Sequence, residues 1–200
     1  MEFKLETISS LEEIATVLER ASSEKHHNSN NYVLDNLKKR WKNYILFQKL
    51  TDVVMGGVIA ISGLYRYNSK LARVCDRTWI DPVYRNQYLN KKNEMAVRPI
   101  IDYFVPTQTR YCIDNDIVPF ISVQYPSRTK VLERVARETE LGYELLDDLL
   151  FTCHHDNYDS TNCWHRVISI GDTGLMRKTT DEVDSIHERR VNGGVDLSGV

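Results

Sequence analysis

The stretch from Tyr44 to Gln87 decides the fold, because it holds three successive β-rich runs. They are Tyr44–Thr51 (YILFQKLT), Val53–Ser62 (VVMGGVIAIS) and Leu71–Ile80 (LARVCDRTWI). The connections between them are short and polar, and the third run opens at Pro82 into a charged turn and a helix. Runs with this spacing predict an antiparallel meander, with the loop that follows its third run at one end of the sheet. We expect the binding site of the protein at that loop.

The sequence on either side of the meander predicts further strands and helices. Before it come a strand at Phe3–Ile8, an amphipathic helix at about Ser10–Ser22 and a second helix after Asn31. After it come a helix following Asn93, a strand at Val118–Gln124, a helix following Pro126, and strands at Tyr143–Cys153 and Cys163–Ile170. This order predicts one α/β (α+β) domain over residues 1–170. Residues 171–200 lack apolar periodicity and are expected to form a flexible tail.

Composition excludes some classes of protein and leaves others open. The 200 residues hold 26 Lys and Arg against 28 Asp and Glu, so there is no overall basic excess to attract nucleic acid. The longest apolar run, Val53–Ile61, falls well short of the ~20 residues that span a bilayer. The four cysteines show no framework spacing, which favours reduced thiols. We therefore expect a cytoplasmic protein that does not cross a membrane.

The third run of the meander carries charge on both of its faces. Arg77 lies on one face and Asp76 on the other, each in the middle of the run. A charge inside a sheet is unfavourable unless it pairs with its neighbours or with a ligand. Two interpretations stay open for Asp76: a residue of a functional site, or a member of an internal ion pair with Arg73 or Arg77.

The predicted order of elements resembles the GNAT superfamily of N-acetyltransferases. The most specific local match is Ile80-Asp81-Pro82-Val83-Tyr84-Arg85, similar to the family's hydrophobic-x-Pro-x-Tyr-Arg run, and Gly142-Tyr143 resembles its entry into the sixth strand. The resemblance implies a mixed, mostly antiparallel central sheet flanked by helices. It also implies that strands Leu71–Ile80 and Val118–Gln124 separate, with an acyl-coenzyme A between them.

The resemblance further implies that the donor, acetyl-CoA or another acyl-CoA, places its pyrophosphate on backbone amides at a helix N-terminus. The residues that it assigns to the donor are Trp79, Ile80, Arg85, Asn86, Gln87, Tyr88, Lys91 and Lys92. Tyr88 and Asn90 occupy positions where the family has small residues, mostly glycine, and their side chains would crowd a pyrophosphate. Three outcomes follow: an inactive site, a reshaped loop that uses Arg85 and the two lysines, or a different donor.

Acyl transfer to an amine needs a base and often an acid for the leaving thiolate. Asp76 is the candidate base on the fourth strand of the family order, with the ion pair as its alternative. Tyr125, directly after the fifth strand, is the candidate acid, with simple packing as its alternative.

Residues of metal-ligand type occur together near the end of the chain. They are Cys153, His154, His155 and Asp156, followed by Cys163 and His165. The spacing fits no standard zinc pattern, so we expect a polar loop between two strands and no metal.

Three functions from different classes remain open. The first is an acyltransferase of the GNAT type that acts on a small-molecule amine, the second a transferase that modifies nucleic-acid bases on the same fold, and the third a binding protein without catalysis. From Tyr65 to Lys130 there are eleven basic residues against six acidic ones. That local excess suits a phosphate-bearing ligand of any kind, including coenzyme A.

Overall fold

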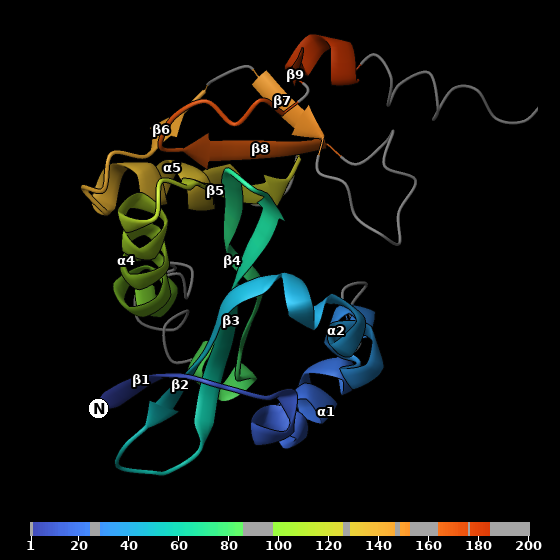
Figure 1. Ribbon diagram of the computed structural model, residues 1–200, viewed down its shortest axis with the longest axis vertical. Helices are drawn as coiled ribbons and strands as arrows, with labels where there is room; N and C mark the ends of the chain where they lie inside the picture. The colour runs from blue at the N-terminus through green and yellow to red at the C-terminus, as the bar shows by residue number, and fades with distance from the viewer. Residues whose placement is uncertain are drawn as a thin grey trace, which may run out of the picture. The chain divides into compact units, whose positions relative to one another are not determined.

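The computed structural model describes residues 2–24, 29–85, 98–125, 129–146, 149–152, 164–175 and 177–184. The chain divides into two compact units, Met1–Ile121 and Ser122–Val200, which are drawn in Figure 1. None of the helices in these residues is long and apolar enough to cross a membrane. Each unit is described by itself.

The first unit is built on the predicted meander. Its antiparallel strands are β1 (Phe3–Thr7), β2 (Tyr44–Asp52), β3 (Val58–Asn68) and β4 (Leu71–Ile80), in that order across the sheet. Strand β5 (Val118–Gln124) then pairs with β4 in the parallel direction. The mixed, mostly antiparallel sheet confirms the predicted fold class.

The turn between β2 and β3 explains where β3 begins. Asp52 Oδ1 accepts hydrogen bonds from the backbone N–H groups of Val54 (2.9 Å) and Met55 (3.0 Å). Gly56 and Gly57 follow with φ angles of 70° and 101°, which L side chains rarely adopt. The two glycines were predicted inside a strand starting at Val53; they belong instead to the turn, and β3 starts after them.

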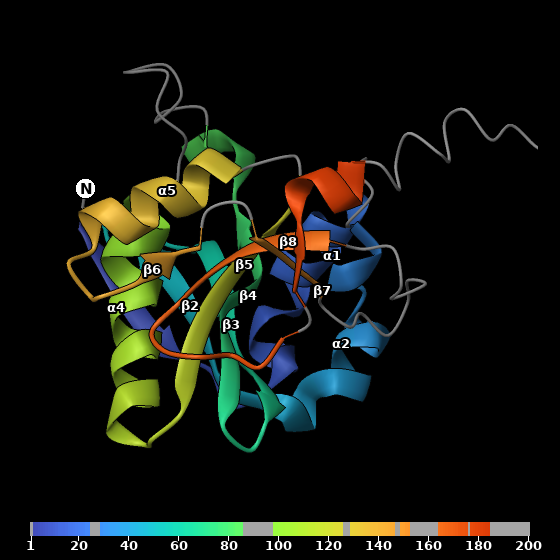
Figure 2. The same cartoon turned by 90° about the horizontal axis from the view of Figure 1, so that it is seen from above.

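Helices cover both faces of this sheet (Figures 1 and 2). A 3-10 turn (Leu11–Ile14), α1 (Ala15–Ser23) and α2 (Leu34–Arg40) lie on one face, and α4 (Arg98–Asp114) lies on the other. The core under α1 and α2 includes Ile14, Leu18, Leu37, Phe47, Ile61 and Trp79. The core that includes Phe104 of α4 contains Leu50, Ile59, Ala60 and Ile80. Burial of these apolar side chains holds the helices on the sheet.

The second unit contains α5 (Thr129–Glu138) and four short strands. These are β6 (Glu144–Leu145), β7 (Leu149–Thr152), β8 (Trp164–Ser169) and β9 (Arg177–Thr179). Strand β8 pairs with β6 and β7, and β7 pairs with β9, all antiparallel.

Part of the expected tail is a packed element of the second unit. Strand β9 pairs with β7, and Val183, in the helical turn that follows, is fully buried against Leu150 and Trp164. No apolar periodicity marks this segment, and Val183 is its buried apolar residue among the residues described. Residues 185–200 of the expected tail lie outside the described residues.

Candidate functional site

Strand β4 is distorted on both sides of Asp76. Its register with β3 runs through the pairs Ile61–Trp79, Gly63–Asp76 and Tyr65–Arg73. Strand β4 therefore has one extra residue before Asp76 and another after it. Cys75 and Arg77 have φ angles of 59° and 52°. Left-handed residues other than glycine cost of order 1–3 kcal/mol each and persist only where their surroundings fix them.

The double bulge lies where β4 leaves β5. The ladder between the two strands joins Leu71 to Val118, Ala72 to Pro119 and Arg73 to Phe120. Pairing thus stops just before the bulge. The two strands are not paired along their full length, which agrees with the separation expected for them. Beyond Arg73, β4 and β5 are not paired with each other.

On the α4 face, two buried glutamines fix the bulge. Gln108 Oε1 accepts a 2.9 Å hydrogen bond from the backbone N–H of Cys75, and Gln108 Nε2 donates to Gln48 Oε1 at 3.2 Å. Both glutamine side chains are buried. Burial raises the pKa of the Cys75 thiol to about 12, which keeps it protonated. Cys75 is therefore a packing residue rather than a nucleophile.

On the opposite face, Asp76 lies among arginines. Its side chain is 1% exposed, and its Oδ1 lies 3.4 Å from Arg73 Nη1 and 3.9 Å from Arg77 Nη1. Burial alone would raise the pKa of Asp76, but Arg77 and Arg73, with help from Arg40, outweigh it and hold that pKa below its usual value. Asp76 is therefore an ionised carboxylate.

Tyr44 makes the shortest contact with Asp76, donating its hydroxyl to Oδ2 at 2.6 Å. Gly63 makes this possible, because a Cβ there would lie 2.5 Å from Tyr44 Cε1 and 2.9 Å from Phe47 Cδ2. Burial, and then the charge of Asp76, raises the pKa of Tyr44 well above its usual value. The tyrosine hydroxyl stays protonated and acts as a fixed hydrogen-bond donor.

Arg40 of α2 completes this group. Its guanidinium lies over the ring of Tyr65, 4.5 Å from the centroid, and the Tyr65 hydroxyl accepts a 3.1 Å hydrogen bond from Asn43 Nδ2. We call Arg40, Tyr44, Arg73, Asp76 and Arg77 the bulge cluster. It contains three guanidinium groups and one carboxylate.

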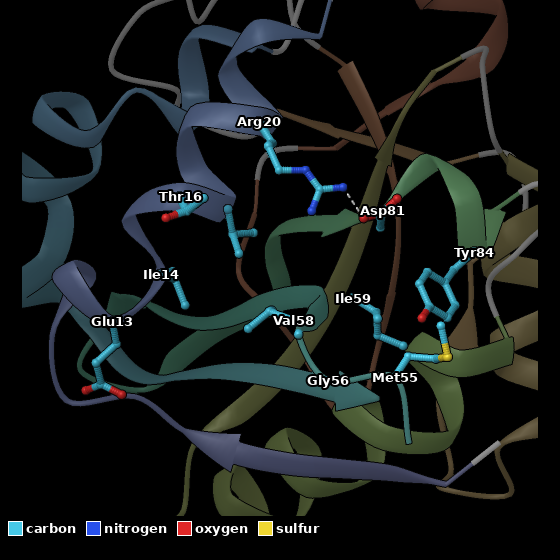
Figure 3. A pocket seen from close by; sticks show the side chains of 12 residues that line it. Glu13, Ile14, Thr16, Arg20, Met55, Gly56, Val58, Ile59, Asp81 and Tyr84 are labelled. Atoms are coloured by element: carbon cyan, nitrogen blue, oxygen red, sulfur yellow. Dashed lines mark hydrogen bonds and ion pairs between the residues drawn. The ribbon is translucent and has the colours of Figure 1, made fainter. Parts of the chain in front are cut away.

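A second set of charges lies at the end of β4, and we call it the junction clamp. Arg20 of α1 pairs with Asp81 (Figure 3), and Arg85 Nη2 pairs with both carboxylate oxygens of Glu24, at 2.7 and 2.9 Å. Trp79 Nε1 also donates to Glu24, at 2.6 Å. The clamp fastens α1 to the start of the helical turn that follows β4.

A groove of about 520 Å³ lies beside the clamp, between α1 and the β2–β3 turn (Figure 3). Ile14, Val17, Val58 and Ile59 supply its apolar lining. At the margin, Tyr84 donates its hydroxyl to Asp52 Oδ2 at 3.0 Å, which joins the turn to the end of β4.

The predicted site residues fall in different places. Asp76 lies beside Arg73 and Arg77, as the ion-pair interpretation predicted. Trp79 and Ile80 are buried and Arg85 belongs to the clamp. Asn86, Gln87, Tyr88, Asn90, Lys91 and Lys92 lie outside the described residues.

Tyr125 belongs to the second unit, where its hydroxyl donates to Asp184 Oδ1 at 3.1 Å. Burial and then this carboxylate raise the pKa of Tyr125. Of the residues of metal-ligand type, His165 is buried in β8, while Cys153, His154, His155, Asp156 and Cys163 lie outside the described residues. No group of three potential metal ligands occurs among the residues that are described.

Sequence reasoning did not place Arg40, Tyr44 and Gly63 beside Asp76. The only signal for Gly63 is a single glycine inside an apolar strand, which suggests a close approach without saying by what. Arg40 belongs to a basic run, Lys38 to Lys42, that predicted a solvated helix face with an anion contact as the alternative, and the role of Tyr44 depends on the register between strands.

Comparisons with solved structures relate this architecture to N-acetyltransferases. A putative phosphinothricin N-acetyltransferase matches with a TM-score of 0.51 and 11% identity over 84% of this chain and 97% of that one. A spermidine N-acetyltransferase chimera from Vibrio cholerae and hSSAT matches with 0.51 and 12% over 85% and 95%. A probable acetyltransferase from Staphylococcus epidermidis matches with 0.52 and 11% over 86% and 100%. No protein-family model and no curated protein sequence matches the chain. The chain therefore has a GNAT-like fold.

Proposed function

We propose that the protein transfers an acyl group from an acyl-CoA, with acetyl-CoA as the first candidate, to an amine. The observation that carries the proposal is the end of the β4–β5 ladder at Arg73, next to the double bulge. Coenzyme A has a peptide-like arm, which can hydrogen-bond to an open strand edge as an added strand would. The GNAT-like fold supports the same assignment.

The junction clamp changes the expected role of Arg85. To bind a donor phosphate, its guanidinium must first leave Glu24, to which it is joined by two short hydrogen bonds. We therefore assign the donor phosphates to the backbone after Arg85 and to Lys91 and Lys92. Arg85 instead keeps the start of that segment in place.

The proposal retains Asp76 and Tyr125 as candidates for the base and the acid. Asp76 is ionised, as a base must be, but its low pKa makes it a weak proton acceptor at neutral pH. Its contacts favour a role in positioning Arg73 and Arg77. Tyr125 can protonate a leaving thiolate only after its hydroxyl turns away from Asp184.

The test is a thermal-shift screen with acetyl-CoA and longer acyl-CoA species, followed by release of the free thiol in the presence of amines. A ligand that binds only the native state raises its melting temperature. We expect a donor-dependent increase and thiol release that requires an amine. If no acyl-CoA shifts the melting temperature, Tyr88 and Asn90 have closed the donor site, and the protein is a binding protein on this fold.

A further inference from the structure

Strand β1 leaves one of its two edges without a neighbouring strand. It is the outermost strand of its sheet, with β2 on its inner side. In the part of the chain that the structure describes, no strand pairs with its outer side. The backbone N–H and C=O groups on such an edge form a template to which another strand can bind. The backbone and the side chains of β1 decide which strand fits it.

The hydrogen bonds to β2 show which residues of β1 face outward. Just before β1, Val53 donates its N–H to Glu2 O at 2.9 Å. Just after it, Ile8 donates its N–H to Phe47 O, also at 2.9 Å, and the register between these two points is unbroken. Backbone groups of an antiparallel strand point alternately to its two sides, so the even-numbered residues bond to β2. The backbone groups that point to the free edge belong to the odd-numbered residues, Phe3, Leu5 and Thr7.

The two faces of β1 carry side chains of different character. Phe3 and Leu5 pack against the core that contains Phe104 of α4. On the opposite face, Lys4 Nζ lies 2.8 Å from Glu6 Oε1, and the two side chains are 66% and 32% exposed. Water screens this pair, so it contributes little to the stability of a single chain. Both charges are therefore available to a strand that binds at the edge.

The order of these two charges is complementary to itself. In an antiparallel pair of β1 strands from two copies, with Leu5 facing Leu5, each Lys4 lies opposite the Glu6 of the other copy. The backbone allows this register, because Leu5 faces Leu5 and Phe3 faces Thr7 as hydrogen-bonded pairs. Opposite charges that face each other across two strands stabilise the pairing, and like charges oppose it. A shift of two residues would place Lys4 opposite Lys4 or Glu6 opposite Glu6, and a shift of one would misalign the backbone groups.

We propose that the outer edge of β1 binds the β1 strand of a second copy of this chain, antiparallel and centred on Leu5. Charged residues on an edge strand often prevent pairing, and here their order disfavours every register but one. The contact is symmetric, and it is small because β1 has 5 residues, so the dimer is weak and depends on concentration. This interaction is independent of the proposed function.

Sedimentation equilibrium of the full chain, from about 1 µM to about 1 mM, should show a monomer–dimer equilibrium. Thr7→Pro removes an outward N–H at an exposed residue, a position where an edge strand tolerates proline. It should raise the Kd of the dimer by at least about 10-fold, through lost backbone hydrogen bonds, and leave the melting temperature in dilute solution nearly unchanged. A wild type that is monomeric at every concentration, or an unchanged Kd for Thr7→Pro, would overturn the inference.

A charge-swap experiment tests the register. Lys4→Glu and Glu6→Lys each place like charges opposite each other, so either variant alone should raise the Kd by at least about 10-fold. An equimolar mixture of the two variants restores opposite charges at both positions and should form a heterodimer with nearly the wild-type Kd. The control is Lys70→Glu in the exposed β3–β4 turn, which changes the net charge as Lys4→Glu does and should leave the Kd unchanged. If the mixture associates no better than its components, the inference is wrong.

Amide hydrogen exchange locates the interface without any variant. Above the Kd, the amides of Phe3, Leu5 and Thr7 should exchange more slowly than in dilute solution, because the second copy covers them. The amides of Lys4 and Glu6 bond to β2 in both states and should change much less. A dimer in which the outward amides of β1 exchange as fast as in dilute solution uses another surface, and that result also overturns the inference.

Discussion

The junction clamp and the bulge cluster both set arginines against carboxylates, but they balance charge differently. The clamp has two arginines and two acids, and Arg85 reaches Glu24 at 2.7 and 2.9 Å. In the cluster, Arg73 and Arg77 share the carboxylate of Asp76, at 3.4 and 3.9 Å. Balanced, close pairs suffice to fasten one element to another. The looser contacts join residues of one strand, β4, and fasten no second element to it.

The two sets also differ in their exposure to water. Arg20 and Arg85 of the clamp have side chains that are 52% and 34% exposed, whereas those of Arg73 and Arg77 in the cluster are 17% and 11% exposed. Water screens the clamp, so each of its pairs contributes little to stability. A buried carboxylate among arginines has no such screening, and its removal leaves the remaining charges uncompensated.

The largest effect is expected from Asp76→Asn, which keeps the shape of the side chain and removes its charge. Arg73 and Arg77 then lose the carboxylate that they share, so we expect the free energy of unfolding to fall by about 3–5 kcal/mol. Chemical denaturation measures it. If turnover disappears while stability is unchanged, Asp76 acts as the base and the ion-pair interpretation is wrong.

Gly63→Ala tests the packing that holds Tyr44 against Asp76. The new methyl would lie 2.5 Å from the Tyr44 ring, which already packs against Phe47 and Tyr65 with ring centroids 4.9 and 5.2 Å away. Such overpacking should cost about 1–3 kcal/mol in thermal or chemical unfolding. The control is Gly142→Ala, where nothing lies near an added methyl and only the φ angle of 83° is unfavourable. An unchanged stability of Gly63→Ala would mean that the Tyr44 ring moves aside freely.

Glu24→Gln tests the clamp, and we expect a smaller loss of about 1 kcal/mol, since Arg85 is about one third exposed. The loss should shrink further at high salt, because salt screens exposed charges. The corresponding loss for Asp76→Asn should hardly depend on salt. A strong salt dependence for Asp76→Asn would contradict the difference in screening between the two regions.

The smallest effect at neutral pH concerns the titration of Asp76. The pKa of Asp76 is lower in the folded state than the usual value of 3.8. The ionised carboxylate therefore contributes fully to stability at a pH above 3.8. This contribution disappears as the pH falls through the lower pKa of the folded state. Acid unfolding should therefore be steeper in the wild type than in Asp76→Asn below about pH 4. Parallel acid-unfolding curves would show that the arginines do not stabilise the ionised carboxylate.

Much of the first unit follows from residue types alone. The meander is predictable because in each of its three runs apolar residues alternate with polar ones or follow one another without a break. Asp76 was predictable as a residue with a partner, because a charge in such a run needs one. The double bulge was not predictable, since Cys75 and Arg77 are residues that seldom adopt positive φ angles. The partners of Asp76 depend on the β2–β3–β4 register, which residue types do not specify. Strand β9 was missed because it is a three-residue strand without an apolar pattern.

The hydrogen bond between Gln108 and the Cys75 amide has a consequence for the order of folding. Strands β3 and β4 are joined by a tight turn and can pair early, because their contacts are local. The amide of Cys75 finds its partner only when α4, 33 residues further along the chain, has docked. The left-handed backbone at Cys75 is thus stabilised by a long-range contact, and β4 should pass through a more regular pairing before it. The distorted shape of the strand is therefore complete only once α4 has docked.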